Sequence, residues 1–231
     1  GEVEVLVILD EALTGLDLPD ARIHLGSHEI VDAVVRSAGI GNHARFERSV
    51  RLRNRTEVAG SLESLSSDRI DGVVDLLLTI RETDDFIEWW RKRAVADGSA
   101  ATLPKEVAEA VDAFSSHLQV FTSAVPPERV RVDLSELGTQ DYYTGIAFGV
   151  YAPDVDSAIA RGGRYDRLLH AFGSDAASVG FSMYTRKIPY RRAPNSSGVT
   201  GDAPAKAAGD SLQNRLIDAR ERHTRGESVH L

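Results

Sequence analysis

Apolar residues recur with strand or helix spacing in clear segments of the first part of the chain. Residues 21–27 (ARIHLGS) predict a short strand. Residues 28–40 place their apolar side chains on one helical face and end near Gly39, which is typical of a helix C-terminus. Residues 1–14 fit both periods, because alternating valines lead into an apolar run that continues through Leu13. For that segment, strand and helix both stay open.

The middle of the chain predicts a set of helices. Residues 41–68 are polar and arginine-rich with weak periodicity, whereas residues 70–80 form an apolar helical segment. Residues 82–93 carry acidic side chains at the start and basic ones at the end, which suits the helix macrodipole. A further helix is predicted from Pro104, since proline fits a first helical turn. Together these segments predict a helical insertion at about residues 41–125.

The pattern changes to strands after this insertion. Residues 129–135 (RVRVDLS) alternate as a strand does. Residues 145–152 and 157–161 form a predicted hairpin, and Pro153 presets the backbone of the turn between them. Residues 178–184 predict a last strand. The chain therefore combines an antiparallel sheet with helices, an α+β arrangement.

Composition narrows the possible classes of protein. The 231 residues carry a net charge of -8, so nucleic acid is not an expected partner. The absence of cysteine excludes disulfides, thiolate metal sites and cysteine nucleophiles. No apolar run reaches the roughly 20 residues of a membrane helix. The first residues show neither the basic region nor the cleavage site of a signal peptide, so a cytoplasmic protein without membrane contact is predicted. Residues 189–231 are rich in small and charged residues and predict a disordered tail.

A tyrosine-rich stretch around the hairpin is the strongest candidate site. Tyr142 and Tyr143 precede the hairpin, and Gly162 and Gly163 are interpreted as freeing the backbone ahead of Tyr165. Tyrosine rings offer flat faces with a hydroxyl at the tip, which suit a small ring-bearing ligand. The neighbouring charged residues that would orient these hydroxyls are Asp141, Arg164 and Asp166. A purely structural role is the alternative: the tyrosines would be half-buried residues of the sheet, and Asp166 would cap the following helix. This alternative stays open.

The motifs of this region resemble a known family. DYYTG (141–145), VYAP (150–153), IARGGRYDRLL (159–169) and VGF (179–181) are similar to the second half of the histidyl-tRNA synthetase catalytic domain. They resemble more closely the paralogous regulatory subunits of ATP phosphoribosyltransferase. The resemblance implies a class II aminoacyl-tRNA-synthetase-like antiparallel sheet flanked by helices, incomplete at the N-terminus. Residues 1–188 would form this partial domain.

The resemblance also implies a ligand site. The family holds histidine between two tyrosines, which correspond here to Tyr143 and Tyr165. The full expected set is Tyr142, Tyr143, Thr144, Gly162, Gly163, Arg164 and Tyr165. Tyr142 is expected to point to the opposite face from Tyr143, as neighbours in a strand do. No cofactor and no metal are implied.

Several positions depart from the synthetase pattern. An arginine expected just before the tyrosine pair is Gly138, and a glutamate expected after Phe148 is Gly149. In the third class II motif, Tyr184 stands where the family has a glycine. Lys187 stands near the position of the family's arginine that contacts ATP. A lysine does not reproduce the two-pronged contact of a guanidinium group with phosphate. The first two class II motifs and an anticodon-binding domain are not found.

These departures indicate a non-catalytic chain. The resemblance then implies a regulatory subunit in histidine biosynthesis, with the catalytic subunit of ATP phosphoribosyltransferase as partner and histidine as effector. Two alternatives stay open: a histidyl-tRNA synthetase or related histidine-activating enzyme, and a truncated remnant without activity. The arginines that bind ATP would separate the enzyme from the regulatory subunit.

Two further groups are weaker candidates. His24 and His28 lie near Glu29, but no third metal ligand is evident, so surface polar residues are the interpretation. Trp89 and Trp90 are interpreted as one core anchor and one interface residue in preference to a platform that stacks nucleic acid bases.

Overall fold

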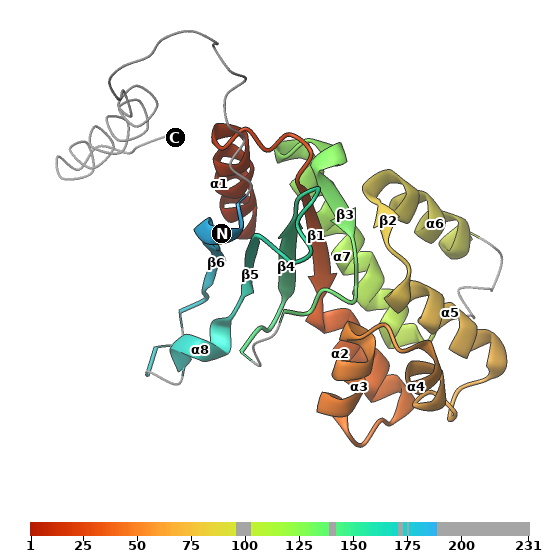
Figure 1. Cartoon of the computed structure of the whole chain (residues 1–231). Helices are drawn as coiled ribbons and strands as arrows, with labels where there is room; N and C mark the ends of the chain where they lie inside the picture. Colours follow the sequence, from red (N-terminus) through yellow and green to blue (C-terminus); the bar gives the residue numbers. More distant parts are fainter. Residues whose placement is uncertain (96–102, 139–141, 171–172, 175, 189–231) are drawn as a thin grey trace, which may run out of the picture. The chain divides into compact units, whose positions relative to one another are not determined.

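A six-stranded sheet with the order β2-β3-β1-β4-β5-β6 forms the centre of the structure (Figure 1). The computed structural model describes residues 1–95, 103–138, 142–170, 173–174 and 176–188. The strands are β1 (Arg22–Ser27), β2 (Arg81–Glu82), β3 (Val130–Val132), β4 (Ile146–Tyr151), β5 (Ala160–Arg164) and β6 (Val179–Met183). The candidate Asp141 and the predicted tail lie outside the described residues.

One pair of neighbouring strands departs from the predicted antiparallel sheet. β1 pairs in parallel with β3, whereas the other neighbouring pairs are antiparallel. A parallel pair needs a crossover connection. Here the chain leaves β1, forms the helices between the two strands and returns to β3 in the same direction. The predicted class II synthetase-like sheet flanked by helices is otherwise confirmed.

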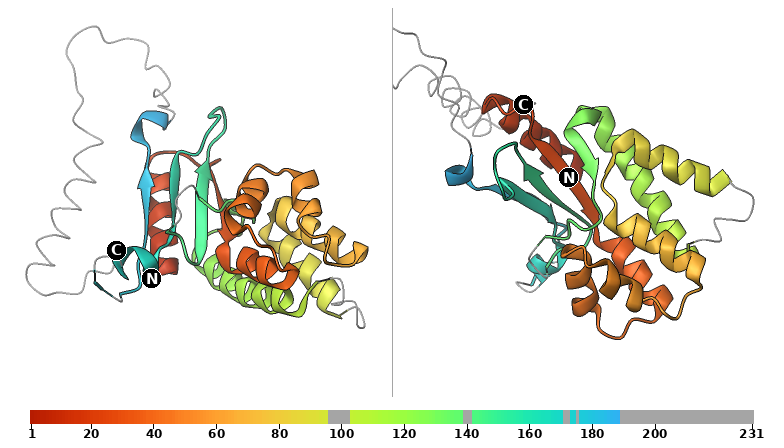
Figure 2. Two further views of the ribbon diagram at one scale, coloured as in Figure 1. Left: turned by 90° about the horizontal axis from the view of Figure 1, so that it is seen from below. Right: turned by 45° about the vertical axis from the view of Figure 1, so that its right-hand side comes forward.

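Most of the helices come from the segment between β1 and β3 (Figure 2). They are α2 (His28–Ala38), α3 (His43–Arg51), α4 (Arg55–Gly60), α5 (Ser67–Leu78), α6 (Thr83–Val95) and α7 (Lys105–Ala124). α1 (Glu2–Gly15) precedes the sheet and α8 (Asp166–His170) follows β5, with short 3-10 turns at Pro127–Arg129 and Thr185–Lys187. Among the helices described, none is long and apolar enough to cross a membrane.

The first segment of the chain is a helix, which resolves its ambiguous pattern. Leu6, Leu9 and Leu13 of α1 are fully buried, and their spacing of three and four residues places them on one helical face. They join the core that α1 and α7 form with the apolar face of the sheet, where Phe148 and Val150 of β4 are buried. The alternating valines are only partly buried, so the leucines determine the type of element.

Gly162 and Gly163 lie within β5 and not in a turn before the next helix. Gly162 pairs with Phe148, and Gly163 pairs with Ala147, so the predicted returning strand at 157–161 is shifted toward its C-terminus. A Cβ atom on Gly162 would come within 2.6 Å of Cβ of Phe181, and one on Gly163 within 2.6 Å of the Ile146 carbonyl oxygen. The two glycines therefore allow close packing on both faces of the sheet.

Candidate functional site

Three tyrosine rings gather beside the end of β5. The ring centroids of Tyr142 and Tyr143 are 5.0 Å apart, and those of Tyr142 and Tyr165 are 5.8 Å apart. Tyr143 and Tyr165 are separated by 6.3 Å. The prediction that Tyr142 points away from Tyr143 is wrong, because residues 142–145 are not part of a strand and strand alternation does not apply to them. The structure thus brings together all the tyrosines of the predicted site.

Small residues of the sheet make room for these rings. Ala147, Gly163 and Gly180 are successive cross-strand neighbours on β4, β5 and β6. A Cβ atom on Gly163 would lie 2.7 Å from Cδ1 of Tyr143, and one on Gly180 would lie 2.6 Å from the Tyr165 hydroxyl. The rings therefore lie directly on the backbone of the sheet.

The phenol of Tyr143 stays protonated at neutral pH. Burial, together with the neighbouring Tyr142 hydroxyl, raises the pKa of Tyr143 to about 12. A neutral phenol both donates and accepts a hydrogen bond, which a polar ligand atom requires. Gly138 supports the ring from the other side, since a Cβ atom there would come within 2.6 Å of Cε2 of Tyr143. The glycine at the position of the expected arginine thus packs against the tyrosine.

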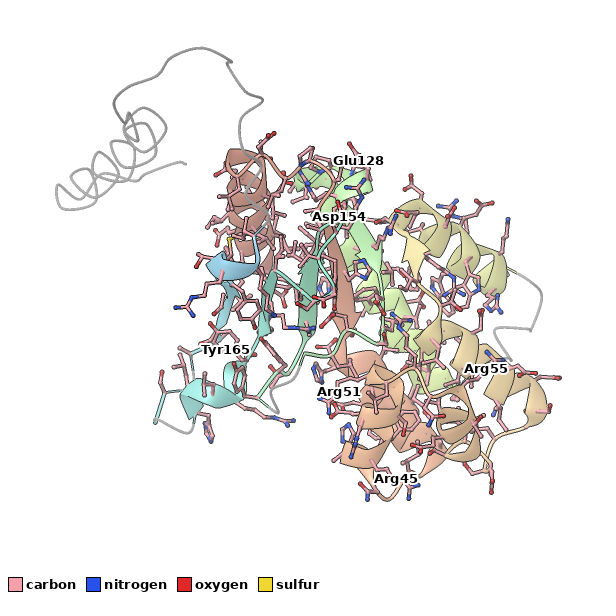
Figure 3. All side chains as sticks on the ribbon, in the orientation of Figure 1. Arg45, Arg51, Arg55, Glu128, Asp154 and Tyr165 are labelled. Atoms are coloured by element: carbon pink, nitrogen blue, oxygen red, sulfur yellow. The ribbon has the colours of Figure 1, made fainter. Side chains whose placement is uncertain are left out.

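Thr144 and Asp166 connect the tyrosine segment to β5 and α8. The Thr144 amide donates to the Arg164 carbonyl (2.9 Å), and the Asp166 amide donates to the Thr144 hydroxyl (3.3 Å). Asp166 accepts from Nε of Arg164 (2.8 Å) and from the Ser178 amide (2.9 Å). Figure 3 shows Tyr165 at the junction of β5 and α8. Arg164 and Asp166 therefore bind each other and hold the elements together.

A cavity of about 250 Å³ adjoins the tyrosine cluster on the side of α2 and α3. Its lining residues are His28, Asp32, His43, Ala44, Glu47, Tyr143, Thr144 and Arg167. Tyr143 and Thr144 belong to the predicted site, whereas the others come from α2, α3 and α8. The other predicted residues do not line this cavity: Tyr142, Gly162, Gly163, Arg164 and Tyr165.

His28 is a buried residue of this cavity and not the surface residue that the sequence predicted. Its Nε2 atom lies 2.8 Å from the Leu137 carbonyl, and its Nδ1 atom lies 3.2 Å from Oε1 of Glu47. The imidazole also stacks on Tyr143, with ring centroids 6.2 Å apart. The hydrogen bond with His28 is the main cause that lowers the pKa of Glu47. Within the described residues, no group of three or more metal-binding side chains occurs.

A second polar group lies on the same face of the sheet, at Gly149. Tyr151 and Arg161 both donate hydrogen bonds to the buried carboxylate of Glu136. A Cβ atom on Gly149 would come within 2.7 Å of Oε2 of Glu136. Burial and the hydrogen bond to Glu136 raise the pKa of Tyr151 to about 12. The carboxylate expected on the strand at 149 is thus supplied to this space from another part of the chain.

The other candidates from the sequence bind or pack against neighbouring side chains of the fold. His24 binds the buried Asp133 through Nδ1 (3.1 Å), so it also differs from the predicted surface residue. Trp90 is buried and donates to Asp112 (2.6 Å), which confirms one core anchor. The guanidinium groups of Arg81 and Arg93 each lie over the ring of Trp89, 4.4 and 4.3 Å from its centroid.

The sequence did not reveal the α2 and α3 side of the cavity. Asp32 follows His28 by four residues, and Glu47 follows His43 by four residues, so each pair shares a helix face. This four-residue spacing was the sequence signal that could have pointed to these residues. It does not tell which two helix faces meet, because this depends on how the helices pack.

The sheet, its helical insertion and the tyrosine–glycine site define a chain of the class II aminoacyl-tRNA synthetase catalytic-domain type. The family model described as histidyl-tRNA synthetase matches residues 1–188, and the chain belongs to this family. A curated relative named ATP phosphoribosyltransferase regulatory subunit, from Teredinibacter turnerae, is 29% identical over 242 aligned residues and covers 99% of this chain and 58% of its own length. The chain spans about half the length of the curated relatives it matches.

Solved structures with the same fold include two described as ATP phosphoribosyltransferase proteins. The regulatory subunit/histidyl-tRNA synthetase from Bacillus halodurans has a TM-score of 0.67 at 20% identity and covers 99% of this chain and 57% of its own. The ATP phosphoribosyl transferase complex from Thermotoga maritima has a TM-score of 0.52 at 20% identity, over 79% of this chain and 60% of its own. At these identities the likeness shows the fold.

Proposed function

We propose that this chain acts within a regulatory, non-catalytic subunit of ATP phosphoribosyltransferase, which binds the catalytic subunit and senses histidine. The names of the curated relatives support the regulatory role. The Thermotoga maritima structure, described as a complex, supports a catalytic chain as the partner. Histidine as effector rests on the resemblance of the tyrosine site to the histidine pocket of the family.

The surroundings of Lys187 carry the non-catalytic part of the proposal. The Nζ atom of Lys187 lies 4.8 Å from the centroid of the Tyr184 ring, directly after β6. The resemblance would place an arginine that contacts ATP near this position. A lysine that packs on a tyrosine offers no planar fork to a phosphate. Loss of such groups removes several kcal/mol of transition-state stabilisation from adenylate formation.

The structure also supports a polar ligand near the tyrosines. Tyr143 and Thr144 line a cavity, and Tyr142 and Tyr165 hold the Tyr143 ring from the side. In our proposal Tyr143 contacts histidine, and the other tyrosines fix the position of its ring. Gly163 supports the same group through packing against Tyr143, and Arg164 supports it through the ion pair with Asp166. Gly162 packs against Phe148 and Phe181.

The second candidate function is a histidine-activating enzyme. The family match favours it, because the family is described as histidyl-tRNA synthetase. The features that disfavour it are Gly138 and Lys187, neither of which supplies an arginine for ATP. A remnant without activity is the third possibility, and a stable complex with the catalytic chain would argue against it.

Three measurements on the purified chain test the proposal. Pyrophosphate exchange with histidine and ATP is expected to stay at background, whereas the catalytic chain of ATP phosphoribosyltransferase is expected to co-elute with this chain in size-exclusion chromatography. The phosphoribosyltransferase rate should change when this chain is added. Clear histidine-dependent exchange would place the enzyme first. No co-elution and no change in rate would leave the regulatory role without support.

A further inference from the structure

The helix α3 and the start of α4 are rich in arginine, although the chain as a whole is acidic. Residues 42–57 contain five arginines and two glutamates, whereas the whole chain has a net charge of -8. Phe46 and Val50 are buried on the inner side of α3, so packing against the core fixes the position of this helix. The arginines on its outer side therefore form a basic surface on a rigid element.

Two of these arginines have no charged partner within the chain. Arg45 and Arg48 are exposed, and neither forms an ion pair or a side-chain hydrogen bond with any residue in the parts of the chain that the structure describes. Arg53 differs, because it pairs with the buried carboxylate of Asp133 at 2.6 Å. Arg45 and Arg48 are therefore available to a carboxylate from outside the chain, which a guanidinium group binds in a bidentate manner.

The two free arginines share a helix face with an exposed leucine. Arg45, Arg48 and Leu52 follow each other at intervals of three and four residues, which places them on one side of α3. Leu52 is 67% exposed, more than any other large hydrophobic residue that the structure describes. Arg51 lies on the side toward the sheet, where it donates to the Gly138 carbonyl at 3.2 Å, whereas Arg45 lies on the outer side (Figure 3). The outer face of α3 thus combines two cations with an apolar side chain.

A cavity of about 510 Å³ adjoins this face. Arg45 and Phe46 line it together with the end of α2 and the residues that follow α4. Its volume lies within the roughly 300–1,000 Å³ of sites for small molecules, so it has room for a side chain of a docked segment. The outer face of α3 is therefore bordered by a hollow.

The chemistry of this face favours a short acidic protein segment over nucleic acid. A net charge of -8 repels a long polyanion, which disfavours nucleic acid as the partner. The single aromatic residue of α3, Phe46, is buried, and Leu52 offers no flat ring on which a base could stack. An acidic segment that carries an apolar residue matches both the arginines and Leu52.

We infer that the outer face of α3 docks an acidic segment of a protein partner, through ion pairs with Arg45 and Arg48 and an apolar contact with Leu52. The identity of this partner as the catalytic chain rests on the proposed function, whereas the face and the acidic chemistry rest on the residues of α3. Exposed charges of this kind accelerate association and make it depend on salt.

Binding measurements with two probes at low and high salt test the inference. The probes are the catalytic chain of ATP phosphoribosyltransferase and a hexaglutamate peptide. Arg45→Glu and Arg48→Glu are each expected to raise the dissociation constant for both probes at least about tenfold at low salt and to reduce its salt dependence. Leu52→Ser is expected to raise the constant about threefold or more for the catalytic chain alone, because hexaglutamate has no apolar side chain. Its salt dependence should not change.

The matched controls make the same changes elsewhere on the surface. Arg91→Glu on α6 and Val120→Ser on α7 alter exposed residues and should bind both probes as the unchanged chain does. Arg48→Gln removes the charge without reversing it and should give a smaller loss of the same kind. This variant keeps the test decisive if a glutamate at position 48 disturbs the helix. Circular dichroism of all variants checks that the fold is retained.

The outcomes separate the docking face from the proposed function. If the arginine variants bind the catalytic chain as tightly as the unchanged chain does, the inference is wrong and the function stands. If the catalytic chain does not bind but hexaglutamate binds through Arg45 and Arg48, the face stands without the proposed function. Binding of neither probe to the unchanged chain overturns the inference. A short single-stranded RNA that binds more tightly than hexaglutamate, and is lost in the same variants, also overturns it.

Discussion

Gly163 is needed for close packing and not for the flexible turn that its sequence suggested. Gly163 lies in β5, paired with Ala147 and Gly180, and its missing side chain leaves room for the Tyr143 ring. The sequence motif identified these glycines as part of the site. Their physical role became clear only from the strand register, because a dipeptide of glycines is compatible with a turn and with a crowded strand.

Replacing Gly163 by alanine should destabilise the fold. The added Cβ atom would lie 2.6 Å from the Ile146 carbonyl oxygen and 2.7 Å from Cδ1 of Tyr143, so the backbone or the ring must move. We expect Gly163→Ala to lower the free energy of unfolding by about 1–3 kcal/mol, measured by urea denaturation. Gly60→Ala is the control, since nothing lies within 4 Å of its added atom at the end of α4. Equal stability of the two variants would refute the packing role.

Asp133 should make stability depend on acidic pH. Burial acts to raise the pKa of Asp133, but hydrogen bonds from His24 and Ser135 and the charge of Arg53 outweigh it and hold the pKa below its usual 3.8. The unfolded chain thus takes up the proton at higher pH than the folded chain. The stabilisation is therefore present above about pH 4 and is lost as the pH falls through the lower folded value.

The variant Asp133→Asn isolates this contribution. At pH 7 it should lower the free energy of unfolding by about 1–3 kcal/mol, because the partners lose a charged acceptor. The loss should shrink as the pH falls from about 4 through the lower pKa of folded Asp133, because the native carboxylate then becomes protonated as well. Denaturant titrations at pH 7 and pH 3 measure it, with the exposed Asp71→Asn as control. A difference that stays constant with pH would show that the charge of Asp133 is unimportant.

At the scale of elements, local patterns predicted most helices and strands but not how they meet. α2 begins after Ser27 and ends at Gly39 with a positive φ of 64°, as its sequence indicated. The parallel pairing of β1 with β3 depends on residues far apart in the chain, and so does the cavity that α2 and α3 line together with Tyr143. Most of the cavity lining was therefore missed, and only Tyr143 and Thr144 were found from their motif.

At the scale of the whole molecule, β6 is an edge strand of the described sheet. In the strand order β6 follows β5 and has no further neighbour among the described residues. An open edge presents unpaired backbone groups, and two copies can pair through the same edge about a two-fold axis. Phe181 and Met183 on this strand are only partly buried, which adds apolar surface to the edge. We therefore expect the isolated chain to self-associate through β6.

A charge on this edge should weaken the association. Ser182 is exposed on β6 and pairs with Arg161 of β5, so a glutamate there gains an opposite cross-strand charge and leaves the fold intact. Sedimentation velocity should show an apparent dimer dissociation constant at least about tenfold higher for Ser182→Glu than for the unchanged chain, since two facing carboxylates repel each other. Ser116→Glu on α7, also exposed, adds the same charge away from the edge and should not change the constant. If all three chains remain monomeric at the highest concentration measured, the chain does not self-associate through β6. The free backbone groups of β6 would then form hydrogen bonds with water.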